Sequence, residues 1–461
     1  MVDDKLKNLQ GTARRNFLRW TAAAGAVLTL DRAKVLDVIA DTAGTGMADA
    51  ASCVTTNRSV HLVAGNGGFA WFQLLWPHVE IAKSSNENFA FHGYGKALDA
   101  TDTDRPFVHA PEAPWQGLDK RRRISAFMAG KNETHTDTPT TASTLGGGVA
   151  MLATVAALQS SLPSILPVIG IGPFSFGTAA GAPQVATVSN ADGMVELFNS
   201  AASKQTLALP KDAALFEAYY KAFLGLSAAA GRPTWARSLR TGKASASLLG
   251  KNLASQLAPT SADMDRYGIG AGTPTKIVDI AKALITTARA FQLQLTQSVV
   301  VSALRDDPHG AFKDMTTLES TVTQLGKVLD EFMNDLIALD DPVCAGRSIA
   351  DSVIMTVHGD TPKNPRDRSG WPDGTPNNSN WLYVMGNGHL KTGWFGGVRE
   401  DGTTDGFDPT TGQIVPNQQS NVTSAAAGAA VAYAVTKGDM RRVQDFYRGP
   451  SIAGIVNQSA P

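Results

Sequence analysis

Four side chains near the ends of two apolar runs have the chemistry of metal ligands. Asp307 and His309 follow one run, and His358 and Asp360 follow another. Carboxylate oxygens and imidazole nitrogens together suit a divalent metal of the zinc, manganese or iron type. If the four groups meet, they could hold one divalent ion, such as zinc, manganese, calcium or iron. The alternative is that each histidine is a hydrogen-bonded loop residue.

A third segment places a histidine between two hydroxyl groups. His135 lies between Thr134 and Thr136, and a hydroxyl beside a base or a metal can act as a nucleophile. The run 133–139 is equally compatible with a helix-entry cap, because threonine and aspartate side chains accept hydrogen bonds from free backbone amides. The sequence leaves both interpretations open.

The elements expected to position these segments are buried strands that alternate with amphipathic helices. Short β-branched runs bounded by glycine, proline or polar residues are typical of buried parallel strands. They are residues 60–64, 165–169, 298–302 and 353–357. Apolar residues at helical spacing predict helices over 148–159, 192–202, 211–228, 244–257, 274–293, 316–339 and 424–436. The alternation predicts a layered α/β/α domain with a mostly parallel central sheet.

The expected site lies at one edge of that sheet, because ligands of open α/β sheets bind beyond the carboxyl ends of the strands. The strand at 60–64 runs into a glycine-rich turn at 65–68, where the backbone can approach a ligand closely. The turn lacks the spacing of a dinucleotide or P-loop fingerprint. We therefore expect this turn, the Asp307 loop and the His358 loop to meet above one edge of the sheet.

The chain after residue 50 is predicted to form one domain. Residues 51–461 contain no proline- or serine-rich hinge. The segment 364–419 is rich in Gly, Asn, Asp, Pro and Thr, which predicts a loop-rich insertion with a few short strands. Its tryptophans, Trp371, Trp381 and Trp394, are expected to pack under the loops rather than to form a ligand platform.

Residues 1–50 have the pattern of an export signal. Arg14 and Arg15 precede a mildly apolar run at 21–30, which is shorter than the roughly 20 residues that span a bilayer. The pattern fits the hydrophobic region of a twin-arginine signal. It predicts export by the Tat translocase to the periplasm or the outside of the cell. The alternative is an amphipathic helix with a chance arginine pair.

The composition of the chain limits the classes of partner that it is expected to bind. The net charge is zero, with 43% hydrophobic and 18% charged residues, which indicates a soluble globular protein and gives no sign of a nucleic-acid partner. No later segment reaches transmembrane length.

The only cysteines, Cys53 and Cys344, each precede an expected strand. Parallel neighbouring strands would place both sulfurs at the same end of the sheet, so we predict a disulfide, with two separate thiols as the alternative.

These motifs resemble a family of twin-arginine-exported bacterial proteins whose fold is related to alkaline phosphatases and sulfatases. The resemblance covers most of residues 58–455 and is specific at four places. They are 62–68 with Pro77, 132–139, 307–309, and 357–362 followed by Trp381 and 386–388. When the chain is aligned with the family on these motifs, the family's acidic residues or Asp-His are replaced by Ala70, Val357 and the pair Ser379-Asn380. Three expected metal-binding places have therefore lost their ligands.

The resemblance leaves three functions open. A two-metal centre holds its ions about 3.5–4 Å apart, each with several ligands. The candidate ligands that remain in this sequence are few for such a centre. The chain could keep the fold and bind a glycan, an envelope component or a protein partner through the loops of 364–419. It could instead hydrolyse phosphate or sulfate esters with one metal at Asp307, His309 and His358 and a threonine nucleophile. Thirdly, the polar residues could be structural parts of a domain that assembles in the envelope.

Overall fold

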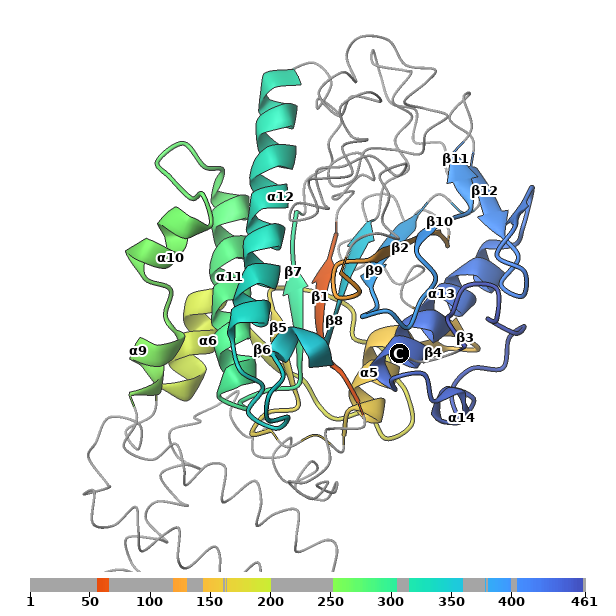
Figure 1. The fold of residues 1–461 in the computed structure, drawn as a ribbon, viewed down its shortest axis with the longest axis horizontal. Helices are drawn as coiled ribbons and strands as arrows, with labels where there is room; N and C mark the ends of the chain where they lie inside the picture. Colours follow the sequence, from red (N-terminus) through yellow and green to blue (C-terminus); the bar gives the residue numbers. More distant parts are fainter. Residues whose placement is uncertain are drawn as a thin grey trace, which may run out of the picture.

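An eight-stranded sheet forms the centre of the protein in the computed structural model (Figure 1). The structure describes residues 56–65, 119–130, 144–160, 162, 164–199, 252–304, 315–359, 378, 380–398 and 404–458. The strands of the sheet lie in the order β10-β2-β9-β8-β1-β7-β5-β6. Their bounds are β1 Arg58–Val63, β2 Ile124–Met128, β5 Val168–Ile171, β6 Ala186–Val188, β7 Ser298–Ser302, β8 Val353–Gly359, β9 Trp381–Met385 and β10 Gly393–Phe395.

Within this sheet only β9 runs against its neighbours. It pairs antiparallel with both β8 and β2, whereas all other neighbouring strands of the sheet pair in parallel. The central strands β1, β8 and β9 are buried at every position, which is typical of strands covered by helices on both faces. The predicted α/β class with a mostly parallel central sheet is confirmed.

Helices cover both faces of the sheet and enclose two hydrophobic clusters. On the first face lie α6 Ala191–Phe198, α11 Thr275–Gln292 and α12 Met315–Ala338, with α9 Leu253–Leu257 and α10 Ser261–Arg266 packed against them. The second face carries α5 Met151–Leu158, α13 Ser420–Val435 and the short α14 Met440–Val443. Among the described residues, no helix has both the length and the apolar character that a membrane span requires.

Smaller elements complete the described structure. A hairpin of β3 Thr144–Gly146 and β4 Val149–Ala150 precedes α5, and the 3-10 helix η6 Ile349–Ser352 precedes β8. A three-stranded sheet consists of β11 Gly397–Val398, β12 Thr404–Phe407 and β13 Ile414–Val415. The hairpin lies against α13 because Gly428 has no side chain: a Cβ there would lie 2.1 Å from the carbonyl oxygen of Thr144.

The strongest sequence patterns predicted their elements to within a few residues. The run 298–302 is β7, and the helices predicted at 274–293 and 316–339 are α11 and α12. The strand predicted at 165–169 instead begins at Val168, after Pro167, which has no backbone N–H to donate to a neighbouring strand. The helix predicted from 148 begins at Met151, because residues 146–148 form the glycine turn of the β3–β4 hairpin.

The segment 364–419 contains short strands, as its composition predicted. Two of them, β9 and β10, belong to the central sheet, which the sequence did not predict. Trp381 of β9 is fully buried, and Trp394 of β10 is half-buried beside Tyr383 with ring centroids 5.5 Å apart. Both tryptophans therefore pack into the protein as predicted, whereas Trp371 lies outside the described residues.

The cysteine prediction is supported at the end that the structure describes. Cys344 is disulfide-bonded, and Cys53, outside the described residues, is the only other cysteine in the chain. The strands that follow the two cysteines, β1 and β8, are parallel neighbours, which is the arrangement that the prediction required.

Candidate functional site

Three adjacent parallel strands end together at the carboxyl edge of the sheet. Val63 at the end of β1 is level with Ser302 of β7 on one side and with His358 of β8 on the other. The chain therefore leaves β1, β7 and β8 side by side, at the edge where parallel sheets bind ligands. The segments that carry the glycine turn, Asp307 and Asp360 thus start next to one another. Their expected meeting above this edge falls outside the described residues and stays a prediction.

Most of the predicted site residues lie beyond those starting points. Outside the described residues are Thr134, His135, Thr136, Asp307, His309 and Asp360. Their proposed roles as nucleophile or metal ligands stay predictions. Of the predicted set the structure describes His358 alone.

His358 lies in the layer between the sheet and helices α5 and α13. Met355 and Val357 of β8 belong to the cluster on the first face, and Ile354 belongs to the cluster on the second face. Because strand side chains alternate between faces, Thr356 and His358 face the second side. Both are buried, with 0% and 3% of their surface exposed.

A threonine hydroxyl joins His358 to a second buried histidine. Thr356 Oγ1 lies 2.7 Å from His358 Nε2 and 2.7 Å from His61 Nδ1. The two imidazole rings meet edge to face, with centroids 6.0 Å apart. The hydroxyl can accept a hydrogen bond from one ring and donate one to the other, so the three side chains form one polar unit that links β1 to β8.

Burial keeps both rings neutral. It lowers the pKa of His358 to about 3. Burial, and then the charge of His358, hold the pKa of His61 well below its ordinary value. An imidazole with so low a pKa is a poor general base near neutral pH. The chemistry available to this pair is therefore hydrogen bonding or ligation by neutral nitrogen.

The described residues contribute little to the predicted metal site. Within the ranges that the structure describes, no group of three or more His, Cys, Asp or Glu side chains could hold a metal ion. The Nε2 atom of His358 is engaged by Thr356, while Nε2 of His61 is buried with no hydrogen-bond partner in the described part of the chain. A metal at this edge would need ligands from the segments beyond the strands.

No family model, curated protein or solved structure matches this chain.

His61 and Thr356 are functional candidates that the sequence analysis missed. Their signal was present as a period of two: polar Ser59 and His61 alternate with apolar residues in β1, as Thr356 and His358 do in β8. Such spacing places all four side chains on one face of the sheet. Because both runs are otherwise mostly apolar, their sequence predicts buried strands rather than a polar site.

The structure describes two of the positions at which metal ligands were expected and other residues stand. Val357 packs into the hydrophobic cluster on the first face with 2% exposure. Asn380 is fully buried, and its backbone oxygen accepts a hydrogen bond of 2.8 Å from the amide of Ala129. A valine packed in this way can provide no ligand.

Substituting Gly359 at the end of β8 is expected to destabilise this edge. A Cβ at this position would lie 1.9 Å from Cε2 of the buried Trp381 ring, so Gly359→Ala forces the ring or the strand to move. We expect a loss of about 1–3 kcal/mol in the free energy of unfolding, measured by urea denaturation. Gly272→Ala is the matched control, since nothing lies within 4 Å of its added methyl group. Equal losses in both variants would contradict the packing described here.

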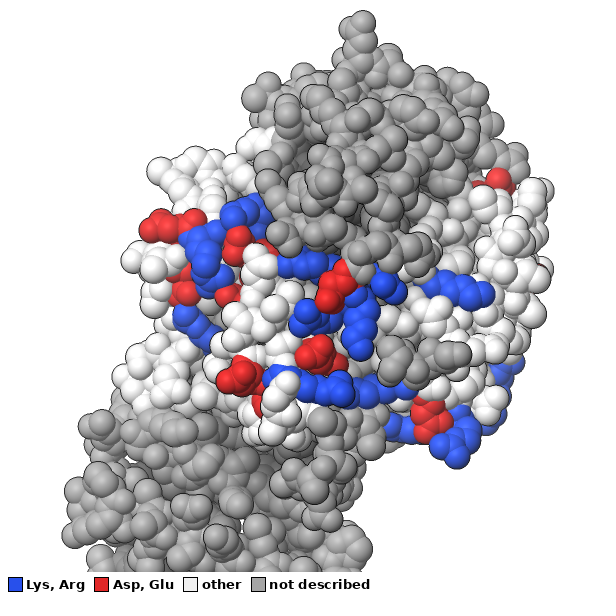
Figure 2. Space-filling view, in the orientation of Figure 1, with Lys and Arg blue, Asp and Glu red and all other residues white. Residues whose placement is uncertain are grey.

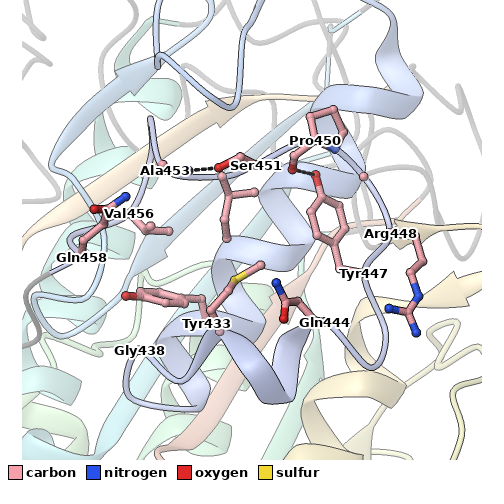
Figure 3. Close-up of a pocket in the computed structure, with 13 residues that line it drawn as sticks. Tyr433, Gly438, Gln444, Tyr447, Arg448, Pro450, Ser451, Ala453, Val456 and Gln458 are labelled. Carbon is pink, nitrogen blue, oxygen red and sulfur yellow. Dashed lines mark hydrogen bonds between the residues drawn. The ribbon is translucent and has the colours of Figure 1, made fainter.

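A cavity of about 670 Å³ lies between the end of α13, α14 and the C-terminal segment (Figure 3). It is on the side where β1 begins, because Asn57 N donates to Val435 O there. The rings of Tyr433 and Tyr447 line it, and Gln444 points toward it (Figure 3). This volume falls in the range of small-molecule sites, about 300–1,000 Å³.

Proposed function

We propose that this chain is an exported envelope protein that has lost a full two-metal site and acts in binding or assembly. Its fold would be a relative of the alkaline phosphatase and sulfatase fold. The observation that carries the proposal is the set of described side chains at the carboxyl edge of the sheet. Where β1 and β8 end, the described side chains are two neutral imidazoles joined by Thr356, with Val357 packed into the core. These groups supply hydrogen bonds and packing rather than the carboxylates of a two-metal centre.

Export is supported by two independent features. The Arg14-Arg15 pair and the short apolar run after it match a twin-arginine signal. The disulfide at Cys344 is typical of proteins that work in an oxidising compartment such as the periplasm. Together they favour the periplasm or the cell exterior.

Binding has two candidate locations in this chain. One is the part of the segment 364–419 outside its strands β9 and β10, and the other is the cavity lined by Tyr433 and Tyr447. The partner we propose is an envelope protein or a glycan. Folds outlast their chemistry, so the ligand must be argued from such sites rather than from the architecture.

One observation favours a second candidate, a metal-dependent hydrolase of phosphate or sulfate esters with a reduced site. The ends of β8, β1 and β7 lie side by side, and the predicted ligands Asp307, His309 and Asp360 follow β7 and β8 within a few residues. One metal held there could still polarise an ester oxygen and lower the pKa of a bound water.

The deciding experiment measures export, metal content and hydrolysis on one preparation. The full chain is expressed with its leader in a Tat-competent bacterium, and the mature protein is purified from the periplasm. We expect no stoichiometric zinc, manganese, calcium or iron by elemental analysis and no turnover of aryl phosphates or aryl sulfates. Replacing Arg14 and Arg15 together by lysine should retain the protein in the cytoplasm.

Two results would overturn the proposal. Turnover of an aryl phosphate or sulfate that His309→Ala abolishes would establish the hydrolase instead. Export that is unchanged by the double lysine substitution would remove the twin-arginine interpretation.

A further inference from the structure

The amino edge of the central sheet, opposite the candidate site, brings together five chain segments. Because β9 is antiparallel, its last residue, Met385, is level with Met355 of β8 and Ile124 at the start of β2. The turn after β9 therefore lies beside the segments that enter β2, β8 and β1 and beside the end of α13. Asn387 Nδ2 donates to Ala350 O at 3.2 Å and ties this turn to η6.

Positive charge gathers at this edge. Two arginines have carboxylate partners: Arg58 pairs with Asp341 at 3.1 Å, and Arg121 pairs with Asp119 at 2.8 Å. Arg121 also lies 3.9 Å from Asp351. Figure 2 shows Lys and Arg side chains interspersed with Asp and Glu side chains across one face of the molecule.

Three further cations at the amino edge remain without such partners. Among the described residues, no carboxylate lies within 4 Å of the charged groups of Lys120, Arg347 or Lys437. Lys437 is half-buried just after α13. Burial lowers the pKa of Lys437, the carboxylates of Asp341 and Asp351 raise it, and the charges of Arg347 and Arg58 lower it. Lys437 has therefore lost part of its hydration in a place where charges of both signs act on it.

A nearly buried histidine lies among them. His389, in the turn after β9, is 7% exposed, and its Nδ1 is buried with no hydrogen-bond partner in the described chain. Burial, followed by the charges of Lys437 and Lys120, lowers the pKa of His389 to about 4, so both ammonium groups act on the ring. A buried ring nitrogen without a partner is unfavourable and indicates that a hydrogen-bonding group is missing.

We infer that the amino edge is a binding site for an oxyanion of the phosphate or sulfate type. Lys120, Arg347 and Lys437 would neutralise its charge, and a ring N–H of His389 would donate to one of its oxygens. Charge-assisted hydrogen bonds of this kind are the strong ones in proteins. One ligand would thus pair with cations that have no carboxylate within 4 Å among the described residues and with the ring nitrogen that lacks a partner.

This site is separate from the proposed function. The two edges lie at opposite ends of β8, whose seven residues span about 20 Å. An oxyanion at the amino edge requires neither a metal nor the loops beyond the carboxyl edge. Failure of either proposal therefore leaves the other standing.

Two sources could present the same oxyanion, and the test distinguishes them. One arm titrates the mature protein with inorganic phosphate and with sulfate and follows the His389 ring by NMR. The second arm measures co-flotation with vesicles of phosphatidylglycerol against vesicles of phosphatidylcholine. Binding in the first arm alone indicates a free ion, and selective binding of phosphatidylglycerol indicates a lipid headgroup.

The variants test the cations directly. We expect Lys437→Met and Lys120→Met each to weaken binding about tenfold. Lys120 lies in a surface turn, so its variant should stay folded even if Lys437→Met does not. Lys282→Met on α11 removes the same charge from the other side of the sheet and should bind like the parent protein. The inference is overturned if neither probe binds, or if Lys120→Met binds as tightly as Lys282→Met.

Discussion

Lowering the pH from about 7.5 to about 5 is expected to reduce the free energy of unfolding by about 2 kcal/mol through His358 alone, and His61 adds to this loss. Burial lowers the pKa of His358 to about 3. Burial and the charge of His358 hold the pKa of His61 well below its ordinary value. In the unfolded chain both rings regain a pKa of about 6.5.

The sign follows from which state binds more protons. Below about pH 6.5 the unfolded rings take up protons, while the folded rings stay neutral until the pH approaches their lowered pKa values, about 3 for His358. His358 therefore favours unfolding by about 1.4 kcal/mol for every pH unit in this window, or about 2 kcal/mol at pH 5, and His61 acts in the same direction. Their contribution to stability is complete above pH 6.5 and is lost as the pH falls toward 3.

Urea denaturation over a pH series checks this prediction. His358→Gln and His61→Gln keep a polar side chain but remove one titrating ring each, so each should lose that ring's share of the parent's pH dependence, about 2 kcal/mol for His358 between pH 7.5 and pH 5. His389→Gln is the control: the pKa of His389 is lowered to about 4, and its removal should leave the share of His61 and His358 intact. The same pH dependence in the parent and in His358→Gln would contradict the buried, neutral pair.

The sequence predicts the middle of the sheet because local and tertiary preferences agree there. The runs that form β1, β7 and β8 are apolar and β-branched, as strands covered on both faces must be. The periodicity of α11 and α12 reports the stripe of each helix that packs on the sheet. β9 was missed since its five apolar residues lie in a segment rich in glycine and asparagine, and its antiparallel insertion between β8 and β2 depends on contacts far apart in the chain.

The edge of the sheet that carries the candidate site was predictable, but the direction of the His358 side chain was not. Parallel strands end at the same edge of a sheet, so adjacent starting points for the segments after β1, β7 and β8 could be expected. Whether His358 points into the layer beneath α5 and α13 is a question of strand register. Because β8 is buried on both faces, burial does not alternate along the strand. Only the polar residues Thr356 and His358 show which face of β8 makes side-chain hydrogen bonds.

Removing the carboxylate of Asp341 is expected to destabilise the protein by about 3–5 kcal/mol, because it leaves a buried arginine charge unpaired. Arg58, at the start of β1, donates to both carboxylate oxygens of Asp341, at 3.1 and 3.2 Å, and to Ser352 Oγ at 2.6 Å. The side chains of Arg58 and Asp341 are 4% and 0% exposed. Asp341→Ala should therefore shift the guanidinium denaturation midpoint strongly downward.

The informative control removes both charges at once. Replacing a buried ion pair by apolar side chains of similar volume is often neutral or stabilising, so Arg58→Met combined with Asp341→Leu should recover most of the loss. Burial alone would raise the pKa of Asp341, but the hydrogen bonds and charge of Arg58 outweigh it and lower the pKa below 3.8. The pair's contribution is therefore present above about pH 4 and lost as the pH falls below it. A double variant as unstable as Asp341→Ala would show that the arginine stem and Ser352, rather than the ion pair, hold the start of β1 in place.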